Sequence, residues 1–306
     1  MHEPRRYGWD MQLGLVGLGR MGANMRDRVR TVGIEVLGYS RTSPTRDVTS
    51  LAELAERLSP PRNVWIMVPA GDATRDTVAQ LADRLSDGDL VVDGGNSHYT
   101  EDQENAQLLA GHGIGYLDCG VSGGIWGARN GYGLMVGGAA EYVERLMPVF
   151  DALRPDGPRE EGFVHAGGVG AGHFAKMVHN GIEYGVMQAY AEGYELLEAA
   201  ELVTDVPAVF KAWQRGTVVR SWLLELLVAA LDRDPKLAQL RGWVQDSGEG
   251  RWTVEEAINH AVPAPVISAA LFARFASRQP DSPAMRAVAA LRQQFGGHAV
   301  QAASPD

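Results

Sequence analysis

The chain has 306 residues, a formal net charge of −10, and contents of 45% apolar and 22% charged residues. This length can form two domains that each bury a core, and the composition is ordinary for a globular protein. The negative charge argues against nucleic acid as a partner, because its phosphates would be repelled without a large basic patch. The sequence contains no run of about 20 apolar residues, so we expect no membrane-spanning helix.

The single cysteine, Cys119, excludes an internal disulfide and a cysteine-based zinc site, which fits a reducing compartment. Residues 1–10 lack the apolar core of a signal peptide and are predicted to be a loose extension. We therefore expect a cytoplasmic enzyme. We expect no metal site, because no cluster has metal-ligand spacing, and we assign no role to His112, His165 or His173.

The chain up to residue 169 alternates between short apolar runs and helix-like stretches. Such alternation indicates a mostly parallel sheet with helices on both faces. We therefore predict a Rossmann-type, doubly wound α/β domain over residues 11–169. Strands are predicted at 11–16, 34–39, 64–68, 90–92, 114–117, 134–136 and 163–165, and helices at 20–32, 51–58 and 73–85.

From Gly170 onwards strand patterns largely vanish, and we predict an all-helical domain over residues 170–306. The first helix could contain about 30 residues and measure about 45 Å, which makes it a long connection out of the glycine-rich junction 167–172. Helical periods fill 171–200, 206–230, 253–260, 264–277 and 283–294.

Gly17, Gly19 and Gly22 form a G-x-G-x-x-G motif directly after the first predicted strand and at the start of a helix. The first glycine permits a tight turn, the second lets a pyrophosphate approach the backbone, and the third lets helix and strand pack. The motif alone is weak and could be a mere turn, but its place in a strand–helix–strand unit favours a dinucleotide. Arg20 and Met21 belong to the same predicted contact.

The loop after the second strand reads Ser40-Arg41-Thr42, where an NAD-binding chain usually presents an acid to the ribose. The two hydroxyls can donate hydrogen bonds, and the guanidinium can pair with a 2′-phosphate. The alternative is a surface loop that happens to contain an arginine. We therefore favour NADP as the cofactor and keep NAD as the alternative.

Two further loops follow predicted strands: Val68-Pro69-Ala70, and the DGGNS segment that contains Asn96. An open parallel sheet binds its ligand at the carboxyl ends of its strands. Either loop could be an ordinary turn. We expect both beside the cofactor, with the Asn96 amide reaching the nicotinamide or the substrate.

The segment KMVHNGIEYG places five polar side chains on one stripe of a helix, namely Lys176, His179, Asn180, Glu183 and Tyr184. A solvated helix face with a Lys–Glu pair is the simplest interpretation. The rest of the circumference is apolar, however, and it includes Gly181 and Gly185, which suggest close packing against another element. A largely buried helix would aim a base, an acid, an imidazole, an amide and a phenol into one cavity, which indicates a catalytic site.

DGGNS, LDCGVSGGIWGARNGYG, KMVHNGIEYG and the terminal FGGH occur in this order between Met11 and Ala299. With these motifs the chain resembles the 6-phosphogluconate dehydrogenases, and its length is similar to that of the short form of this family. The resemblance implies the oxidative decarboxylation of 6-phosphogluconate to ribulose 5-phosphate in the pentose phosphate pathway, with NADP or NAD as the oxidant.

The resemblance also implies residue roles. Lys176 would be the general base and Glu183 the general acid. Arg292 and His298 match tail residues that complete a neighbouring subunit's site, which implies a homo-dimer or a homo-tetramer. The sugar acid and the nicotinamide end would be held by Asn96, Ser122, Gly123, Gly124, His179 and Asn180, and the substrate phosphate by Tyr184 and Arg274.

Two departures from the family pattern matter. Ser247 stands where long-form members place a lysine on the phosphate. It can donate one hydrogen bond to the phosphate but carries no charge, so phosphate affinity would rest more on Arg274 and Arg292. Ser40-Arg41-Thr42 is closer to the NADP-using members than to the NAD-using ones. Two alternative functions remain: another β-hydroxyacid dehydrogenase, acting on a 3-hydroxyisobutyrate-like acid, or a non-catalytic NADP-binding protein on the same fold.

Overall fold

The computed structural model describes residues 11–296 and 299–301, so the predicted extension over residues 1–10 lies outside the described residues. The chain divides into two compact units, with the border between His179 and Asn180. This border falls inside the long helix α8 (Ala171–Ala199). The division into domains at residues 169 and 170 stays a prediction.

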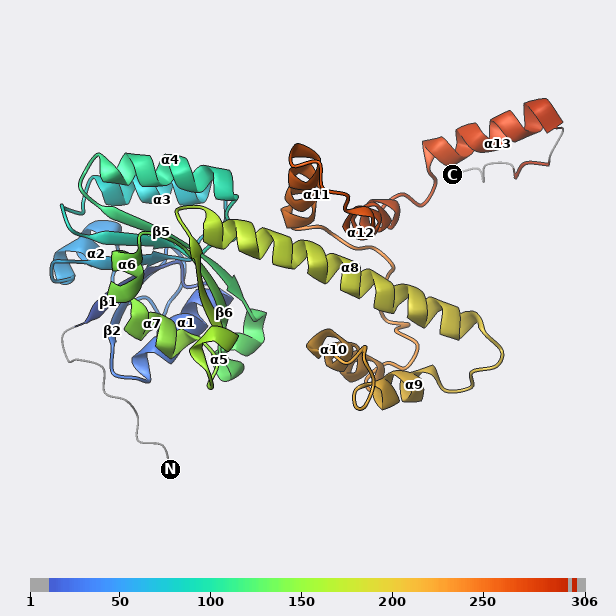
Figure 1. Cartoon of the computed structure of the whole chain (residues 1–306), viewed down its shortest axis with the longest axis horizontal. Coiled ribbons are helices and arrows are strands. Elements are labelled where there is room, and N and C mark those ends of the chain that lie inside the picture. Colours follow the sequence, from blue (N-terminus) through green and yellow to red (C-terminus); the bar gives the residue numbers. More distant parts are fainter. Residues whose placement is uncertain (1–10, 297–298, 302–306) are drawn as a thin grey trace. The chain divides into compact units, whose positions relative to one another are not determined.

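The first unit contains a seven-stranded sheet with the order β2-β1-β3-β4-β5-β6-β7 (Figure 1). Neighbouring strands run parallel except β5 and β6, which are antiparallel. The predicted mostly parallel sheet is therefore confirmed. The strands are β1 (Gln12–Val16), β2 (Glu35–Tyr39), β3 (Asn63–Ile66), β4 (Leu90–Asp93), β5 (Gly115–Ser122), β6 (Gly133–Gly138) and β7 (Phe163–Gly167).

Helices cover both faces of this sheet, as the doubly wound fold requires (Figure 1). One core cluster joins one face of the strands to α1, α6 and α7, and the other joins the opposite face to α2, α3 and α4. The helices of this unit are α1 (Arg20–Arg30), α2 (Leu51–Arg57), α3 (Asp72–Ala82), α4 (Tyr99–Ala110), α5 (Gly127–Asn130), α6 (Ala140–Arg145) and α7 (Met147–Leu153), with short 3-10 turns η1 (Gly124–Trp126) and η2 (Arg159–Glu161).

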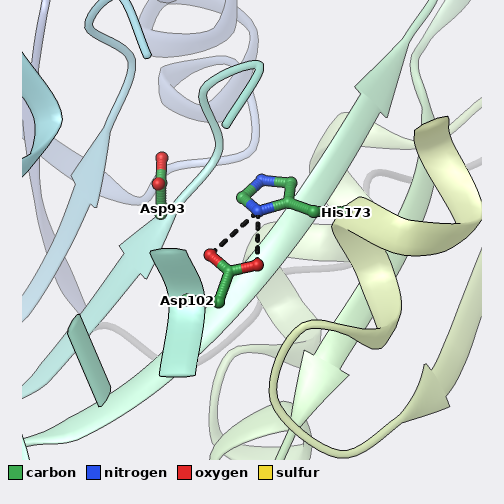
Figure 2. A group of neighbouring side chains, drawn as sticks. All are labelled: Asp93, Asp102 and His173. Atoms are coloured by element: carbon green, nitrogen blue, oxygen red, sulfur yellow. Dashed lines mark hydrogen bonds and ion pairs between the residues drawn. The ribbon is translucent and has the colours of Figure 1, made fainter. Parts of the chain in front are cut away.

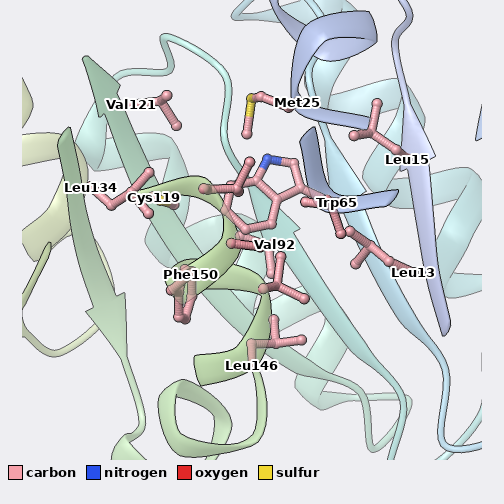
Figure 3. Close-up of a cluster of buried hydrophobic side chains, with 14 of the residues drawn as sticks. Leu13, Leu15, Met25, Trp65, Val92, Cys119, Val121, Leu134, Leu146 and Phe150 are labelled. Carbon is pink, nitrogen blue, oxygen red and sulfur yellow. The ribbon is translucent and has the colours of Figure 1, made fainter. Parts of the chain in front are cut away.

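The β3 strand illustrates why the sheet needs both layers. Val64, Trp65 and Ile66 are all fully buried, and successive side chains of a strand point to opposite faces. Trp65 therefore belongs to one core cluster and its two neighbours to the other. Its ring packs edge-on against Phe150 of α7, with 5.8 Å between the centroids (Figure 3).

Among the described residues from Ala171 onwards the regular elements are helices, and α8 has 29 residues, which confirms the predicted long helix. One predicted helical stretch is wrong: residues 206–230 form two helices. Gly216 has a φ of 75° in the connection, and the Ser221 side chain caps the second helix by accepting from Leu224 N–H. The further helices are α9 (Val206–Trp213), α10 (Trp222–Leu231), α11 (Glu249–Asn259), α12 (Pro265–Ala276) and α13 (Pro283–Gly296).

The glycines of α8 pack as the sequence predicts. A Cβ atom on Gly181 would come within 2.6 Å of the Thr253 side chain on α11, and one on Gly185 would come within 3.1 Å of Val266 on α12. The apolar side of the helix is less buried than expected, because Ile182 is 56% exposed. Within the described residues, no helix has both the length and the apolar character needed to cross a membrane.

Candidate active site

The loop between β1 and α1 is built around glycines. Gly17 has a φ of 102°, and a Cβ atom there or on Gly22 would overlap backbone carbonyl groups, of Met67 and Gly17 respectively. Gly19 faces open space, since nothing lies within 4 Å of a Cβ placed on it. The tight turn and the close helix packing thus exclude side chains at two positions, while the middle one leaves room for a ligand. This cradle fits the pyrophosphate of a dinucleotide.

The start of α1 adds an electrostatic reason for the same fit. Gly19 precedes the helix without a side-chain cap, and the first turn contains no acidic residue. The first N–H groups of a helix and its dipole attract an anion. Arg20 is exposed and Met21 half-buried at this end.

The loop after β2 presents cations. Arg41 and Thr42 are exposed, and Arg46, which the sequence analysis did not single out, donates to the Arg41 carbonyl at 3.1 Å. The Ser40 hydroxyl accepts hydrogen bonds from the N–H groups of Thr42 at 3.4 Å and of Ser43 at 3.2 Å. The serine therefore holds the turn, and the exposed arginines supply the positive charge.

An acid does lie near this loop, but its oxygen is engaged. Asp47 Oδ2 accepts from Arg30 Nη2 at 2.6 Å and from Gly38 N–H at 2.8 Å. Through this oxygen the carboxylate supports the loop. The exposed guanidiniums of this loop could pair with a 2′-phosphate.

The two other loops at this edge of the sheet are also braced from inside. Thr74 Oγ1 donates to the Pro69 carbonyl at 3.0 Å, and in the neighbouring loop Asp93 accepts from Gly95 N–H at 2.9 Å and from Ser97 Oγ at 2.7 Å. Asn96 stands exposed between these two anchors. Val68 is half-buried, whereas Pro69 and Ala70 are exposed.

At the end of β5 the structure brings Ser122 and His179 together, with 3.5 Å between Ser122 Oγ and His179 Nε2. Gly123 and Gly124 follow with φ angles of 122° and 53°, a backbone course that favours glycine. Lys176 lies one turn before His179 on α8 and is only 9% exposed. The hydroxyl, the imidazole and the amine therefore all belong to the first unit.

A second group of predicted residues is assembled within the second unit. The Tyr184 hydroxyl accepts from Ser247 N–H at 3.0 Å and lies 3.2 Å from Ser247 Oγ. The guanidinium of Arg274 lies over the Tyr184 ring, 3.4 Å from its centroid, and it donates to the Gln245 carbonyl at 3.1 Å. Tyr184, Ser247 and Arg274 thus form one cluster, and Glu183 is half-buried beside them in sequence.

Sequence reasoning missed Glu249, the first residue of α11. Its side chain is buried, at 2% exposure, and it accepts hydrogen bonds from Asn180 Nδ2 and from Ser247 Oγ. Ser247 therefore directs its hydroxyl hydrogen to this carboxylate, whereas the sequence analysis expected it to donate to the substrate phosphate. The available signal was the acidic residue between two glycines in SGEG, the segment that contains Ser247.

Of the two predicted tail residues, Arg292 and His298, only Arg292 is among the described residues. Arg292 is exposed on α13, which leaves its guanidinium accessible to a substrate or to another copy of the chain. His298 lies outside the described residues.

A buried cluster was also missed, because the sequence analysis gave His173 no role. His173 on α8 is 2% exposed, and its Nδ1 atom lies 2.9 and 3.0 Å from the carboxylate oxygens of Asp102 on α4 (Figure 2). Burial lowers the pKa of His173, but the hydrogen bond and the charge of Asp102 outweigh it and raise this pKa to about 9. His173 is therefore protonated at neutral pH and faces the carboxyl of Asp102, whose own pKa is raised by burial.

Asp93 lies near this pair, and the three side chains could each offer one ligand atom within 4.8 Å of the others. The hydrogen bonds of these three side chains describe a different arrangement. His173 Nδ1 is bonded to Asp102, Tyr116 donates to Asp102 at 2.7 Å, and both Asp93 oxygens accept from their own loop. We interpret the cluster as an ion-pair network within the protein.

Comparison with known proteins gives the family. Residues 12–155 match the model described as "NAD binding domain of 6-phosphogluconate dehydrogenase", and residues 172–303 match "6-phosphogluconate dehydrogenase, C-terminal domain". An NAD(+)-dependent, decarboxylating 6-phosphogluconate dehydrogenase from Haloferax volcanii is 43% identical over 95% of this chain and 98% of its own length. A decarboxylating 6-phosphogluconate dehydrogenase from Lactococcus lactis is 36% identical over 88% of this chain and 61% of its own length.

Solved structures agree. The Plasmodium falciparum 6-phosphogluconate dehydrogenase, studied with NADP+ and with 6-phosphogluconate, superposes with a TM-score of 0.79 at 28% identity and covers 93% of this chain and 65% of its own. A Mycobacterium tuberculosis 3-hydroxyisobutyrate dehydrogenase gives a TM-score of 0.68 at 23% identity over 92% of this chain and 99% of its own, which shows a shared fold. The chain belongs to the 6-phosphogluconate dehydrogenase family.

Proposed function

We propose that the chain oxidises and decarboxylates 6-phosphogluconate to ribulose 5-phosphate and CO₂ with NADP+ or NAD+. The observation that carries this proposal is the buried Lys176 on α8, in a KMVHNGIEYG segment of a chain that also has the glycine cradle at Gly17. A lysine held away from water at an active site is a recognised general base. The extent of the likeness to the Haloferax volcanii enzyme supports the same substrate.

The reaction divides between the base and the acid. When bound, the nicotinamide accepts the hydride from C3 of the substrate. Lys176 takes the proton of the C3 hydroxyl and then, as an ammonium, stabilises the oxygen that gains charge while CO₂ leaves. Glu183 lies two helical turns further along α8 and delivers the proton that C1 needs to complete the product. Ser122, His179, Asn180 and Asn96 hold the sugar acid.

Recognition of the phosphate falls to Tyr184 and Arg274. The Arg274 fork can meet two phosphate oxygens at once, and its position over the Tyr184 ring directs it towards the same ligand as the phenol. Ser247 contributes less, because its hydroxyl hydrogen is engaged by Glu249.

This arrangement keeps one second candidate open: a related dehydrogenase for an unphosphorylated 3-hydroxy acid. The specific observation in its favour is Glu249, a buried carboxylate next to the proposed phosphate site, since a carboxylate repels a phosphate dianion. Arg274 and Arg292 argue for the phosphorylated substrate. A non-catalytic role is disfavoured, because the base and the acid are both retained.

We also propose a homo-oligomer in a cytoplasmic setting. Large apolar side chains stand exposed on the helices of the second unit, and soluble monomers rarely expose many of them together. Arg292 is predicted to complete the site of a neighbouring subunit, so we propose a second copy of the chain as the partner that covers these side chains. Examples are Ile258, Val266, Phe272 and Leu291, between 58% and 73% exposed.

The decisive experiment is a matched set of steady-state assays. The purified chain is given 6-phosphogluconate, gluconate or 3-hydroxyisobutyrate, each with NADP+ and with NAD+, and both reduced nicotinamide and CO₂ are measured. Of the three substrates, we expect only 6-phosphogluconate to release CO₂. Turnover of gluconate or of 3-hydroxyisobutyrate with no preference for the phosphate would overturn the proposal in favour of the second candidate.

Lys176→Met serves as the catalytic control, because methionine keeps the length of the side chain without a base. It should lower kcat by about 10²- to 10⁴-fold and leave coenzyme binding intact. Light scattering on the same sample measures the oligomeric state, and a monomer would contradict the tail-completed site.

A further inference from the structure

The first turn of α8 is fastened to the sheet by a carboxylate from another element. Asp118 of β5, fully buried, accepts from Gly170 N–H at 2.6 Å and from His173 N–H at 2.8 Å. These N–H groups belong to the start of the helix, where no carbonyl of the same helix can accept their hydrogen bonds. A carboxylate at that end also complements the helix dipole.

The His173 side chain fastens the same turn in a second direction. It forms the buried ion pair with Asp102 of α4 (Figure 2), and Asp102 in turn accepts from the Tyr116 hydroxyl of β5. Charges at 0% and 2% exposure tolerate little movement, because separating them leaves each one unpaired in a medium that solvates it poorly. His173 is therefore fixed from both its backbone and its imidazole.

Lys176 follows His173 by three residues, so the two side chains lie on neighbouring turns of one face. The stem of Lys176 passes directly over Gly120 of β5, where a Cβ atom would overlap the Cβ of the lysine and approach the Gly172 carbonyl to 2.9 Å. Helix α8 and strand β5 are therefore in direct contact at this point, without room for even one more carbon atom. A shift of the first turn would therefore move the amine.

We propose that Asp102, His173 and Asp118 form a positioning unit that holds the amine of Lys176 in place for catalysis. The proposal rests on the proposed function, in which Lys176 is the base. None of the three residues needs to touch substrate. Their role is to fix the turn from which Lys176 projects.

The test compares Asp102→Asn with wild type in the full-length chain. Activity is expressed per coenzyme-binding site, so that any unfolded fraction does not count. We expect kcat with 6-phosphogluconate to fall about 10- to 100-fold, the range that follows from a misplaced catalytic group. The dissociation constant of NADP+ should stay within about twofold of wild type, since the glycine cradle is untouched.

A second readout separates positioning from mere stability. The deuterium isotope effect on kcat with C3-deuterated substrate should rise, because hydride transfer becomes slower relative to product release. Asp89→Asn is the matched control: Asp89 is also fully buried and bonded to an arginine, Arg62, at 2.9 Å, but the hydrogen bonds to its carboxylate come from Arg62 and Ser86, which lie outside α8. It should lower the melting temperature without changing kcat per site or the isotope effect.

His173→Gln gives an independent measurement, because glutamine can still donate to Asp102 but carries no charge. A normal kcat per site in both variants would overturn the inference, whatever happens to their melting temperatures. The proposed function fails separately, if wild type releases no CO₂ from 6-phosphogluconate. A loss of kcat in Asp89→Asn equal to that in Asp102→Asn would also count against positioning.

Discussion

Lys176 and Gly120 lie against each other across the interface between α8 and β5, so closely that a Cβ atom on Gly120 would overlap the lysine stem. Gly120→Ala should therefore displace the helix turn or the strand. We expect a cost of about 1–3 kcal/mol in the free energy of unfolding, as overpacking usually gives, and a loss of kcat larger than that of coenzyme affinity.

Chemical denaturation and steady-state kinetics check this prediction. Gly193→Ala on the same helix is the control, because nothing lies within 4 Å of its added Cβ, and alanine there should be neutral or stabilising by up to about 1 kcal/mol. A Gly120→Ala enzyme with wild-type stability and kcat would contradict the close packing described above.

Replacing Glu183 by glutamine should leave the first half of the reaction intact and block the last proton transfer. Glutamine has nearly the same shape but cannot supply a proton to C1. We expect kcat to fall by about 10²- to 10⁴-fold, while a single turnover still forms reduced nicotinamide. Stopped-flow absorbance measures that first turnover, and its disappearance together with kcat would assign Glu183 a different role.

Arg274→Ala should raise KM for 6-phosphogluconate more than it lowers kcat, because the fork binds a group remote from the reacting carbons. Arg278→Ala is the matched control: it removes an arginine just beyond α12 that pairs instead with Asp246 at 3.0 Å. It should leave KM close to wild type. An Arg274→Ala enzyme that keeps its KM but loses kcat would disprove the phosphate role.

Coenzyme preference can be tested at Arg41, which is exposed in the loop after β2. Arg41→Ala should raise KM for NADP+ by about tenfold or more, the loss expected for one charged hydrogen bond to a phosphate. The KM for NAD+ in the same variant is the internal reference and should hardly change. An equal rise of KM for both coenzymes would mean that the Arg41 guanidinium does not bind the 2′-phosphate.

The stability of the protein should fall as the pH rises from 6.5 to about 9. The folded-state pKa of His173 is about 9, above its ordinary 6.5, so its stabilising contribution is complete below pH 6.5 and is lost as the pH passes the raised value. Urea denaturation across this range should show the slope in wild type and a flatter one in His173→Gln.

The fold was largely predictable from sequence, because its determinants are local. Runs such as Val64–Ile66 are buried on both faces, and a short continuous apolar run before a glycine indicates an interior strand. The error at residues 206–230 has a local cause as well: the apolar period continues through the connection, while Gly216 and the Ser221 cap end it.

The site was predictable only where residues cluster along the chain. The α8 stripe could be found because its members are neighbours on one helix. His173 and Asp102 are 71 positions apart in sequence, and Asn180 and Glu249 are 69 apart, so no pattern in a single sequence connects them. The tertiary fold supplies these contacts, and with them the supports of Lys176 and Asn180.

The two hydrogen bonds that Asp118 accepts from the start of α8 have a practical consequence for chimaeras of this family. A chimaera joined at residue 170 would take Lys176, the proposed base, and Asp118, which accepts hydrogen bonds from the first turn of α8, from two different parent proteins. A junction after His179 follows the natural border between the compact units. With this junction the second unit can be exchanged while Lys176 and Asp118 come from the same parent protein.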